Sequence, residues 1–252
     1  PKLAKSPNVT WANSNTTVTI TAGADTGGSG VARTEYSTNN STWSAYSAAL
    51  TITSSQTVYA RTIDNAGNTS ATAQLAVNID RTRPNAPASV TKSPAANWHN
   101  GNVTVTAAPG TDTGGSGIAR TEYSTDNSTW QTYSAPVSVA SSQTVYARMV
   151  DNAGNISTVK SIAVNIDRDK PSMPQLAKSP AAEWHNGDVT VSVTGGSDTG
   201  GSGVSRTEYS TNGTNWTAYT SAITVASTQT VYARTWDVAG NVSDTATLKV
   251  QI

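Results

Sequence analysis

The chain contains no cysteine and no phenylalanine, and only 13% of its 252 residues are charged. Without cysteine it has neither a disulfide framework nor a thiolate metal site. Its 16 basic and 16 acidic residues balance, which argues against nucleic-acid binding, because such proteins usually present a basic face. No apolar run is as long as a membrane span. We therefore expect no nucleic-acid partner and no membrane insertion.

The residues that are abundant are typical of β-structure. The chain has 41 threonines and 31 serines, and valine, isoleucine, tyrosine and tryptophan supply most of its large apolar side chains. Side chains that are β-branched or aromatic favour strands. The 7 tryptophans and 9 tyrosines occur at regular positions, which argues against disorder despite the low charge.

A repeat of 86 or 87 residues organises the whole chain. Each repeat has a DTGGSG motif, a tryptophan 18 residues later, and a D-x-A-G-N motif 21 residues after that. The DTGGSG motifs begin at Asp25, Asp112 and Asp198. Because a repeat of this length suffices for one small β domain, we predict three domains. We place them at residues 1–80, 81–167 and 168–252.

The linkers suggest that these repeats belong to a longer array. Pro1 matches the prolines that close the linkers at Pro87 and Pro174. We therefore expect neighbouring repeats of the same longer chain to be the immediate partners of this one.

Alternation of apolar and polar residues in the first repeat predicts about seven short strands and no helix. Six of these strands are expected at residues 17–22, 31–37, 42–47, 49–53, 57–63 and 74–79. Seven short strands separated by turn residues are the pattern of immunoglobulin-like and fibronectin-III-like sandwiches. We therefore predict an all-β fold: three tandem Ig-like (fibronectin-III-like) β-sandwich domains in an extended array.

Alternation also predicts which side chains face solvent. Residues 31–37 and 57–63 should be antiparallel neighbours, with Glu35 and Arg61 on the outer face in a solvent-exposed polar ladder. In a chain without phenylalanine, we expect the tryptophans to fill the core and close its ends. The alternative is that exposed tryptophans stack on sugars, which would make the chain a carbohydrate-binding array.

No group of residues suited to catalysis repeats along the chain. His99 and His185 share the motif WHNG, but Ala12 occupies this position in the first repeat, and no repeat has a second histidine. Both histidines are therefore predicted to be exposed turn residues rather than zinc ligands or catalytic bases. DTGGSG lies between two strands and not before a helix, so it predicts a turn rather than a phosphate site. We expect no enzymatic activity.

The aspartates are the strongest candidates for a site. In an Ig-like sandwich, the DTGGSG and D-x-A-G-N loops lie at the end where the chain enters. The last strand of the preceding repeat ends in an aspartate, which should therefore reach the same place. We expect two clusters: Asp80 with Asp112 and Asp151, and Asp167 with Asp198 and Asp237.

Three clustered carboxylates with loop carbonyls suit Ca²⁺, which takes six to eight oxygen ligands. The first repeat has no incoming linker aspartate, so Asp25 and Asp64 would form an incomplete site. In the alternative interpretation, each aspartate caps nearby amides in its turn. The basic linker residues would then neutralise each cluster; they are Arg81, Arg83, Arg168 and Lys170.

Two series of motifs carry a family resemblance. The run V-x-I-D-R-T-R-P, with D-N-A-G-N-x-S before it, resembles the bacterial Ig-like repeats of large secreted surface adhesins. The series W-x-N-x-x-V-T-V-T, D-T-G-G-S-G-V and T-E-Y-S is similar to Ig-like modules appended to secreted polysaccharide-degrading enzymes. The resemblance spans the whole chain, three times over.

The resemblance implies a non-catalytic structural stalk or spacer, secreted and displayed on a bacterial cell surface or in a fibre. It also implies Ca²⁺ at the places where modules meet, as in some adhesin families of this type. Two alternatives stay open: an array that binds carbohydrate or a host surface, and accessory modules of a secreted polysaccharide-degrading enzyme. Cell-wall or host polysaccharide is the corresponding partner.

Overall fold

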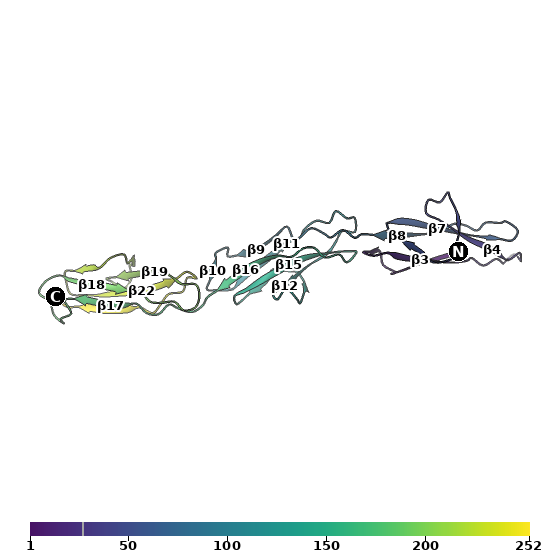
Figure 1. The fold of residues 1–252 in the computed structure, drawn as a ribbon. Helices are drawn as coiled ribbons and strands as arrows, with labels where there is room; N and C mark the ends of the chain where they lie inside the picture. The colour runs from purple at the N-terminus through teal and green to yellow at the C-terminus, as the bar shows by residue number, and fades with distance from the viewer. Residues whose placement is uncertain (27) are drawn as a thin grey trace. The chain divides into compact units, whose positions relative to one another are not determined.

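The computed structural model describes residues 1–26 and 28–252, and Gly27 of the first DTGGSG motif lies outside the described residues. Every regular element in these ranges is a β-strand. The strands form six sheets, which pair into three β-sandwich modules (Figure 1). The prediction of an all-β fold with three tandem Ig-like sandwiches is therefore confirmed.

Module 1 consists of a three-stranded and a five-stranded sheet. Its strands are β1 (Lys2–Ser6), β2 (Trp11–Ala12), β3 (Thr16–Thr21), β4 (Val31–Ser37), β5 (Ser44–Ala45), β6 (Leu50–Ile52), β7 (Gln56–Asp64) and β8 (Ala73–Ile79). The smaller sheet has the order β1-β3-β6, and the larger has the order β2-β8-β7-β4-β5. The short strand β2 pairs in parallel with β8, whereas the other neighbours within this module are antiparallel.

Module 2 has the same two sheets, with the orders β14-β11-β9 and β10-β16-β15-β12-β13. Its strands are β9 (Ser89–Ser93), β10 (Trp98–His99), β11 (Val103–Ala108), β12 (Ile118–Ser124), β13 (Gln131–Thr132), β14 (Val137–Val139), β15 (Gln143–Asp151) and β16 (Lys160–Ile166).

Module 3 repeats the plan with the orders β17-β18-β21 and β20-β19-β22-β23. Its strands are β17 (Gln175–Ser179), β18 (Val189–Thr194), β19 (Val204–Ser210), β20 (Thr217–Ala218), β21 (Ile223–Val225), β22 (Gln229–Asp237) and β23 (Ala246–Val250). A single parallel bridge between Trp184 and Gln251 takes the place of the strand that corresponds to β2.

The chain also divides into two compact units whose limits differ from those of the repeats. Unit 1 comprises Pro1–Val90, Ala107–Ser134 and Tyr146–Lys160. Unit 2 comprises Thr91–Thr106, Ala135–Val145 and Ser161–Ile252. The passage from the first repeat to the second therefore lies within unit 1, and the passage from the second to the third lies within unit 2.

Valine and isoleucine build the core of module 1, not tryptophan. In β3 the side chains of Thr16, Val18 and Ile20 are buried, and those between them are exposed, as alternation predicts. The buried cluster comprises Val18, Ile20, Ile52, Val58, Ala60 and Val77. No tryptophan belongs to the buried core of the described residues, so the prediction that tryptophan fills it is wrong. Leucine and tyrosine side chains complete the packing around this cluster, among them Leu3, Tyr36 and Tyr46.

Tryptophan lies instead on the outer face of the larger sheet, in the polar ladder. Glu35 accepts hydrogen bonds from Arg33 at 2.7 Å and from Arg61 at 2.8 Å, and the Arg61 guanidinium lies 4.1 Å from the ring centre of Trp43. The predicted ladder is confirmed, but Glu35 is only 8% exposed, so the prediction that it faces open solvent is wrong. The long arginine side chains cover the carboxylate.

The ladder recurs in the other modules. Glu122 pairs with Arg120 at 2.6 Å and with Arg148 at 2.8 Å. Burial raises the pKa of Glu122, but hydrogen bonds from Arg148 and Arg120 outweigh this effect, so its pKa lies below the ordinary value. In module 3, Glu208 accepts an additional hydrogen bond of 2.9 Å from the indole N–H of Trp236.

We predict that Glu122→Gln lowers the free energy of unfolding by about 1 kcal/mol at pH 7, because both arginines lose their ionic partner. A depressed folded-state pKa contributes stability above the pKa of an unfolded glutamate, about 4.3, and this stability is lost as pH falls through the folded-state value. Urea unfolding should therefore show a difference at pH 7 that shrinks toward pH 2. The exposed Glu183→Gln is the control, and an equal effect at all pH values would contradict the pairing argument.

Candidate metal centre

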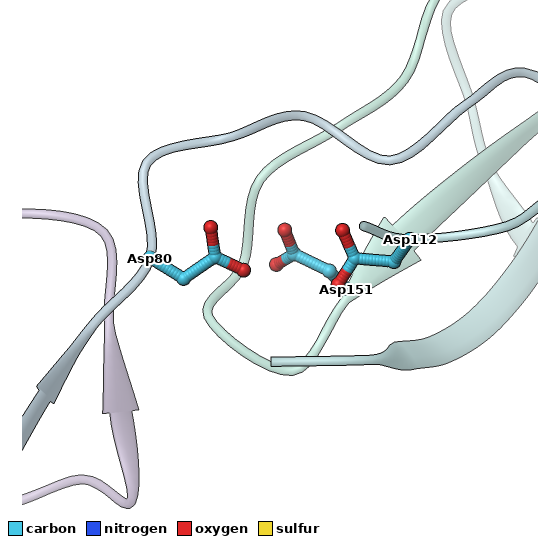
Figure 2. Close-up of side chains that lie close together, drawn as sticks. All are labelled: Asp80, Asp112 and Asp151. Carbon is cyan, nitrogen blue, oxygen red and sulfur yellow. The ribbon is translucent and has the colours of Figure 1, made fainter. Parts of the chain in front are cut away.

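Three aspartates come together at each of two places. In unit 1, Asp80, Asp112 and Asp151 each offer a carboxylate oxygen, and these oxygens all lie within 4.8 Å of one another. Figure 2 shows the three carboxyl groups side by side, with that of Asp80 directed toward that of Asp151. In unit 2 the same arrangement occurs, formed by Asp167, Asp198 and Asp237. These are the two clusters expected from the sequence.

The three members of the first triad come from three separate segments of two modules. Asp80 follows the last residue of β8, and its N–H donates to the carbonyl of Ala12 at 2.8 Å. Asp112 lies in the loop between β11 and β12, and Asp151 is the last residue of β15. Thus the first repeat supplies one carboxylate, and a loop and a strand end of the second repeat supply the other two.

Backbone amides hold the Asp80 carboxylate in place. Its Oδ1 accepts from the N–H of Thr82 at 3.0 Å, and its Oδ2 accepts from the N–H of Ser116 at 3.2 Å. Asp80 is only 3% exposed, and this burial raises its pKa. The hydrogen bonds from Ser116 and Thr82 lower it by more, so the pKa of Asp80 lies below its usual value.

The other two carboxylates of this triad cap their own turns. Asp112 accepts from the N–H of Gly114 at 3.0 Å and from that of Gly117 at 2.7 Å. Asp151 accepts from both the backbone N–H and the side-chain Nδ2 of Asn155, each at 2.8 Å. Three carboxylates, each held by amide donors, therefore share one small volume.

The second triad has the same contacts. Asp167 accepts from the N–H of Ser202 at 3.2 Å, Asp198 from that of Gly203 at 2.6 Å, and Asp237 from that of Asn241 at 2.7 Å. Asp167 and Asp237 are each 2% exposed. Two independent junctions therefore build one geometry.

No basic side chain neutralises either triad in the part of the chain that the structure describes. Arg81 and Arg168 donate instead to asparagine side chains of the preceding repeat. Lys170 pairs with Asp244 at 3.2 Å. The alternative interpretation, in which the aspartates cap turns and basic linker residues neutralise them, is therefore correct only in its first part. The aspartates cap turns, but the described residues show no ion pair between a linker cation and either triad.

The asparagine that ends each D-x-A-G-N motif also belongs to the site, although it was not predicted to. The Nδ2 of Asn155 donates to the carbonyl of Asp80 at 2.9 Å, and that of Asn241 donates to the carbonyl of Asp167 at 2.9 Å. Each asparagine therefore joins the linker aspartate to the D-x-A-G-N aspartate. Its recurrence at a fixed position in all three repeats was the available signal.

The first repeat has the pair Asp25 and Asp64 without a third aspartate in the described residues. Asp25 accepts from the N–H of Gly30 at 2.7 Å, and Asp64 accepts from that of Asn68 at 2.8 Å. Hydrogen bonds from Asn68 hold the pKa of Asp64 below its usual value. Both aspartates line one pocket, as an incomplete version of the triad requires.

The histidine prediction needs correction. His99 is 6% exposed and His185 is half-buried, so neither is the freely exposed turn residue that we expected. His99 is buried because it forms the end of β10, which pairs in parallel with β16. The Nε2 atoms of both histidines are buried without a hydrogen-bond partner.

The fold and the two triads together define tandem immunoglobulin-like or fibronectin-III-like modules with an acidic cluster where one repeat passes into the next. No protein-family model matches the chain. No curated protein matches it significantly. The described residues contain no helix that could cross a membrane.

Two solved structures illustrate what the chain is similar to. The fibronectin(III)-like modules of Clostridium thermocellum CbhA match 66% of this chain and 94% of theirs, with 14% identity and a TM-score of 0.35. Murine CEACAM1b matches 66% of this chain and 100% of its own, with 12% identity and a TM-score of 0.36.

Glycine is required beside the linker aspartate. A Cβ atom on Gly114 would lie 2.5 Å from Oδ1 of Asp80 and 2.8 Å from Cβ of Thr82. A Cβ atom on Gly200 would lie equally close, at 2.5 Å, to Oδ1 of Asp167. The linker and the loop can therefore approach this closely only because glycine, which has no Cβ atom, occupies these two positions.

We predict that Gly114→Ala lowers the free energy of unfolding by about 1–3 kcal/mol, because the added methyl group displaces the Asp80 carboxylate from its amide donors. Chemical denaturation would measure the loss. Gly101→Ala is the matched control, since a Cβ there meets nothing within 4 Å. Equal stability of the two variants would contradict the close packing at the triad.

Proposed function

We propose that the modules are non-catalytic spacers of a repetitive secreted bacterial surface or fibre-forming protein, and that Ca²⁺ at the junctions stiffens them. The observation that carries this proposal is the position of Asp80. It directly follows the last strand of one repeat and lies beside two carboxylates of the next. A cation held there would tie the linker to the following module.

The donor set suits calcium. Two oxygens bound to one Ca²⁺ at 2.3–2.6 Å lie at most about 5 Å apart, and the triad oxygens lie within 4.8 Å of one another. Oδ1 of Asp112 and Oδ2 of Asp151 each accept a single hydrogen bond, and a carboxylate oxygen that accepts one hydrogen bond keeps a lone pair for a cation. Because the described residues place no basic side chain on the triads, the mutual repulsion of the carboxylates favours binding a cation.

Asp80, Asp112 and Asp151 would hold the ion in unit 1, and Asp167, Asp198 and Asp237 would hold it in unit 2. The ion would supply charge neutralisation and a cross-link between linker and loops. The residues of the chain supply the rest of the joint: Asn155 and Asn241 bind the linker carbonyls, and the backbone amides orient the carboxylates.

The sugar-binding alternative has less support. The three tryptophans of the ladder each have an arginine guanidinium over the ring, at 4.1, 4.0 and 3.9 Å from the ring centre. They are Trp43, Trp130 and Trp216. One face of each ring is therefore already occupied, which leaves less aromatic surface for stacking on a sugar.

We predict that a calorimetric Ca²⁺ titration of the chelator-treated chain finds about two ions per chain, one at each triad. Asp80→Asn should remove one ion, and the double variant Asp80→Asn/Asp167→Asn should remove both. Each substitution deletes a charge and replaces a carboxylate oxygen with an N–H donor.

The exposed Asp188→Asn serves as the control and should still bind two ions. Three ions would assign binding to the pair within each repeat, of the Asp25–Asp64 type. No heat at millimolar calcium would overturn the calcium part of the proposal and leave the aspartates as turn-capping residues.

The spacer role predicts an extended particle in solution. Each module has a strand length of about 25 Å before loops are added, so three in line extend on the order of 100 Å. Small-angle scattering with calcium should therefore give a radius of gyration well above the ~18 Å expected for a compact chain of this length. Chelation should broaden the distribution of distances. A compact particle in both conditions would contradict the spacer role.

A further inference from the structure

An open groove lies in unit 1, where the first repeat passes into the second. Its volume is about 690 Å³, and ligand sites in proteins commonly measure about 300–1,000 Å³. Its lining comes from residues 7–14 of the first repeat and from β12 and the D-x-A-G-N loop of the second. Val9 and Trp11 contribute apolar surface, and Asn13 and Asn152 contribute amides. Both repeats are therefore needed to form it.

A second hollow of about 480 Å³ continues this groove. Asn13 and Gly154 line both hollows, so the two are contiguous. The linker residues Arg81 and Arg83 line only the second one. We call the two hollows together the junction groove. It has an aromatic end and a basic end, with the Asn13 amide between them.

The basic end carries charge that the chain does not compensate. In the described part of the chain, Arg83 is exposed and takes part in no hydrogen bond or ion pair. Arg81 donates to two oxygen atoms of the first repeat, which orient its guanidinium without neutralising it. Of the lining residues, only Asp151 is acidic, and its buried carboxylate accepts from Asn155. An anionic group would therefore find two arginines here.

The aromatic end offers an indole that no cation covers. In the described residues, neither arginine nor lysine lies over the ring of Trp11, unlike the rings of the ladder tryptophans. Cη2 of Trp11 lies 3.6 Å from the position of a Cβ atom on Gly115, so the glycine turn supports one edge of the ring. Trp98 lies against Gly201 in the same way, at 3.3 Å. Other atoms of Trp11 line the groove and can stack on a sugar ring.

Two amides beside the indole supply polar groups for hydroxyls. Asn13 is exposed, and no hydrogen bond of the described residues uses its side chain. Asn152 is also exposed, and its Nδ2 donates to the carbonyls of Ser116 and Gly117. Its Oδ1 accepts nothing from the described residues. The groove thus presents both donors and acceptors, and a sugar hydroxyl can use either.

The linker of the second junction lacks the free positive charge. Asp169 stands where the first linker has Thr82. Lys170, the equivalent of Arg83, pairs with Asp244 at 3.2 Å. An added carboxylate and a neutralised cation make this junction unsuited to an anion.

The amides of the second junction differ as well. Asn100, the equivalent of Asn13, donates to the carbonyl of Gly240 at 3.2 Å. Val238, 50% exposed, stands where the other junction has Asn152. Two junctions of one fold therefore present different chemistry, and only the first combines free amides with free arginines in the described residues.

We propose that the junction groove of unit 1 binds an acidic oligosaccharide. One sugar ring lies beside Trp11 and Asn13, and a carboxylate or sulfate group is bound by Arg81 and Arg83. Arginine suits such groups because its planar guanidinium donates paired hydrogen bonds to them. Hydroxyl-rich rings match the free amides, which an acidic peptide would leave unpaired. A spacer with this site would adhere to acidic polysaccharide along its length.

Calorimetric titration with tetragalacturonate in chelating buffer tests the proposal. It should find one site per chain, and the affinity should fall as salt rises, because the arginines carry the charge. A heparin-derived tetrasaccharide shows whether sulfate serves better than carboxylate. Neutral maltotetraose and the peptide tetraglutamate should each bind at least about tenfold more weakly than the better acidic sugar.

Variants locate the site. Arg83→Gln removes an exposed charge that the fold does not use, and should weaken binding roughly tenfold. Asn13→Asp puts a negative charge between the two hollows and should weaken binding further. Lys170→Gln is the matched control, because it changes the equivalent residue of the second junction and should leave binding unchanged. Thermal unfolding checks that each variant is folded.

The titration is repeated with calcium, so that the charge of the triads does not decide the result. No binding of either acidic sugar at about 10 mM in both buffers would overturn the proposal. Equal binding of tetraglutamate or maltotetraose, or wild-type affinity in Arg83→Gln, would overturn it too. None of these results bears on calcium uptake by the triads. Conversely, a chain that takes up no calcium can still bind the sugar in chelating buffer.

Discussion

The structure depends above all on how one repeat ends within the next. The main chain of Asp80 donates to Ala12 of its own module, while its buried carboxylate accepts amide hydrogen bonds from Thr82 and Ser116. Asp80 is therefore hydrogen-bonded to both modules, to the first through its main chain and to the second through its carboxylate. The glycine turn, the asparagine bridge and the clustered carboxylates all follow from this position, because a linker that enters the loops must satisfy its own polar groups there.

Within the modules, valine, isoleucine and alanine supply most of the fully buried apolar side chains, with Met149 among them in module 2. Tyr36 and Tyr46 pack against the core of module 1, whereas Trp43, Trp130 and Trp216 lie under arginine guanidinium groups. The ladder gives the outer face of the larger sheet a dense layer of salt bridges and cation–π contacts in place of open strand surface. Glu35, Glu122 and Glu208 are the centres of this layer.

The sequence predicted the strands with clear alternation, the β4–β7 pairing and both triads, because the repeat period and sandwich topology together determine which loops meet. It did not predict β2, because two residues are too short to show a period. It also misplaced Glu35 and His99. Alternation indicates which face of a sheet a side chain occupies, but not what covers it. Here arginine side chains cover Glu35, and His99 lies in a short strand that pairs in parallel with β16. The asparagine bridges were missed because their acceptors are backbone carbonyls, which no residue pattern reveals.

Trp11 lies against Gly115 in unit 1, and Trp98 lies against Gly201 in unit 2, and these two equivalent contacts bear on how a chain of such repeats could change over generations. Every junction is made from the same few residues, so a gene that gains or loses one repeat by unequal recombination places matching surfaces beside each other again. Such a chain would need no new interface between repeats, and each internal junction would still have both of its contact surfaces. A change in the number of repeats would therefore leave the chemistry of the joints unchanged.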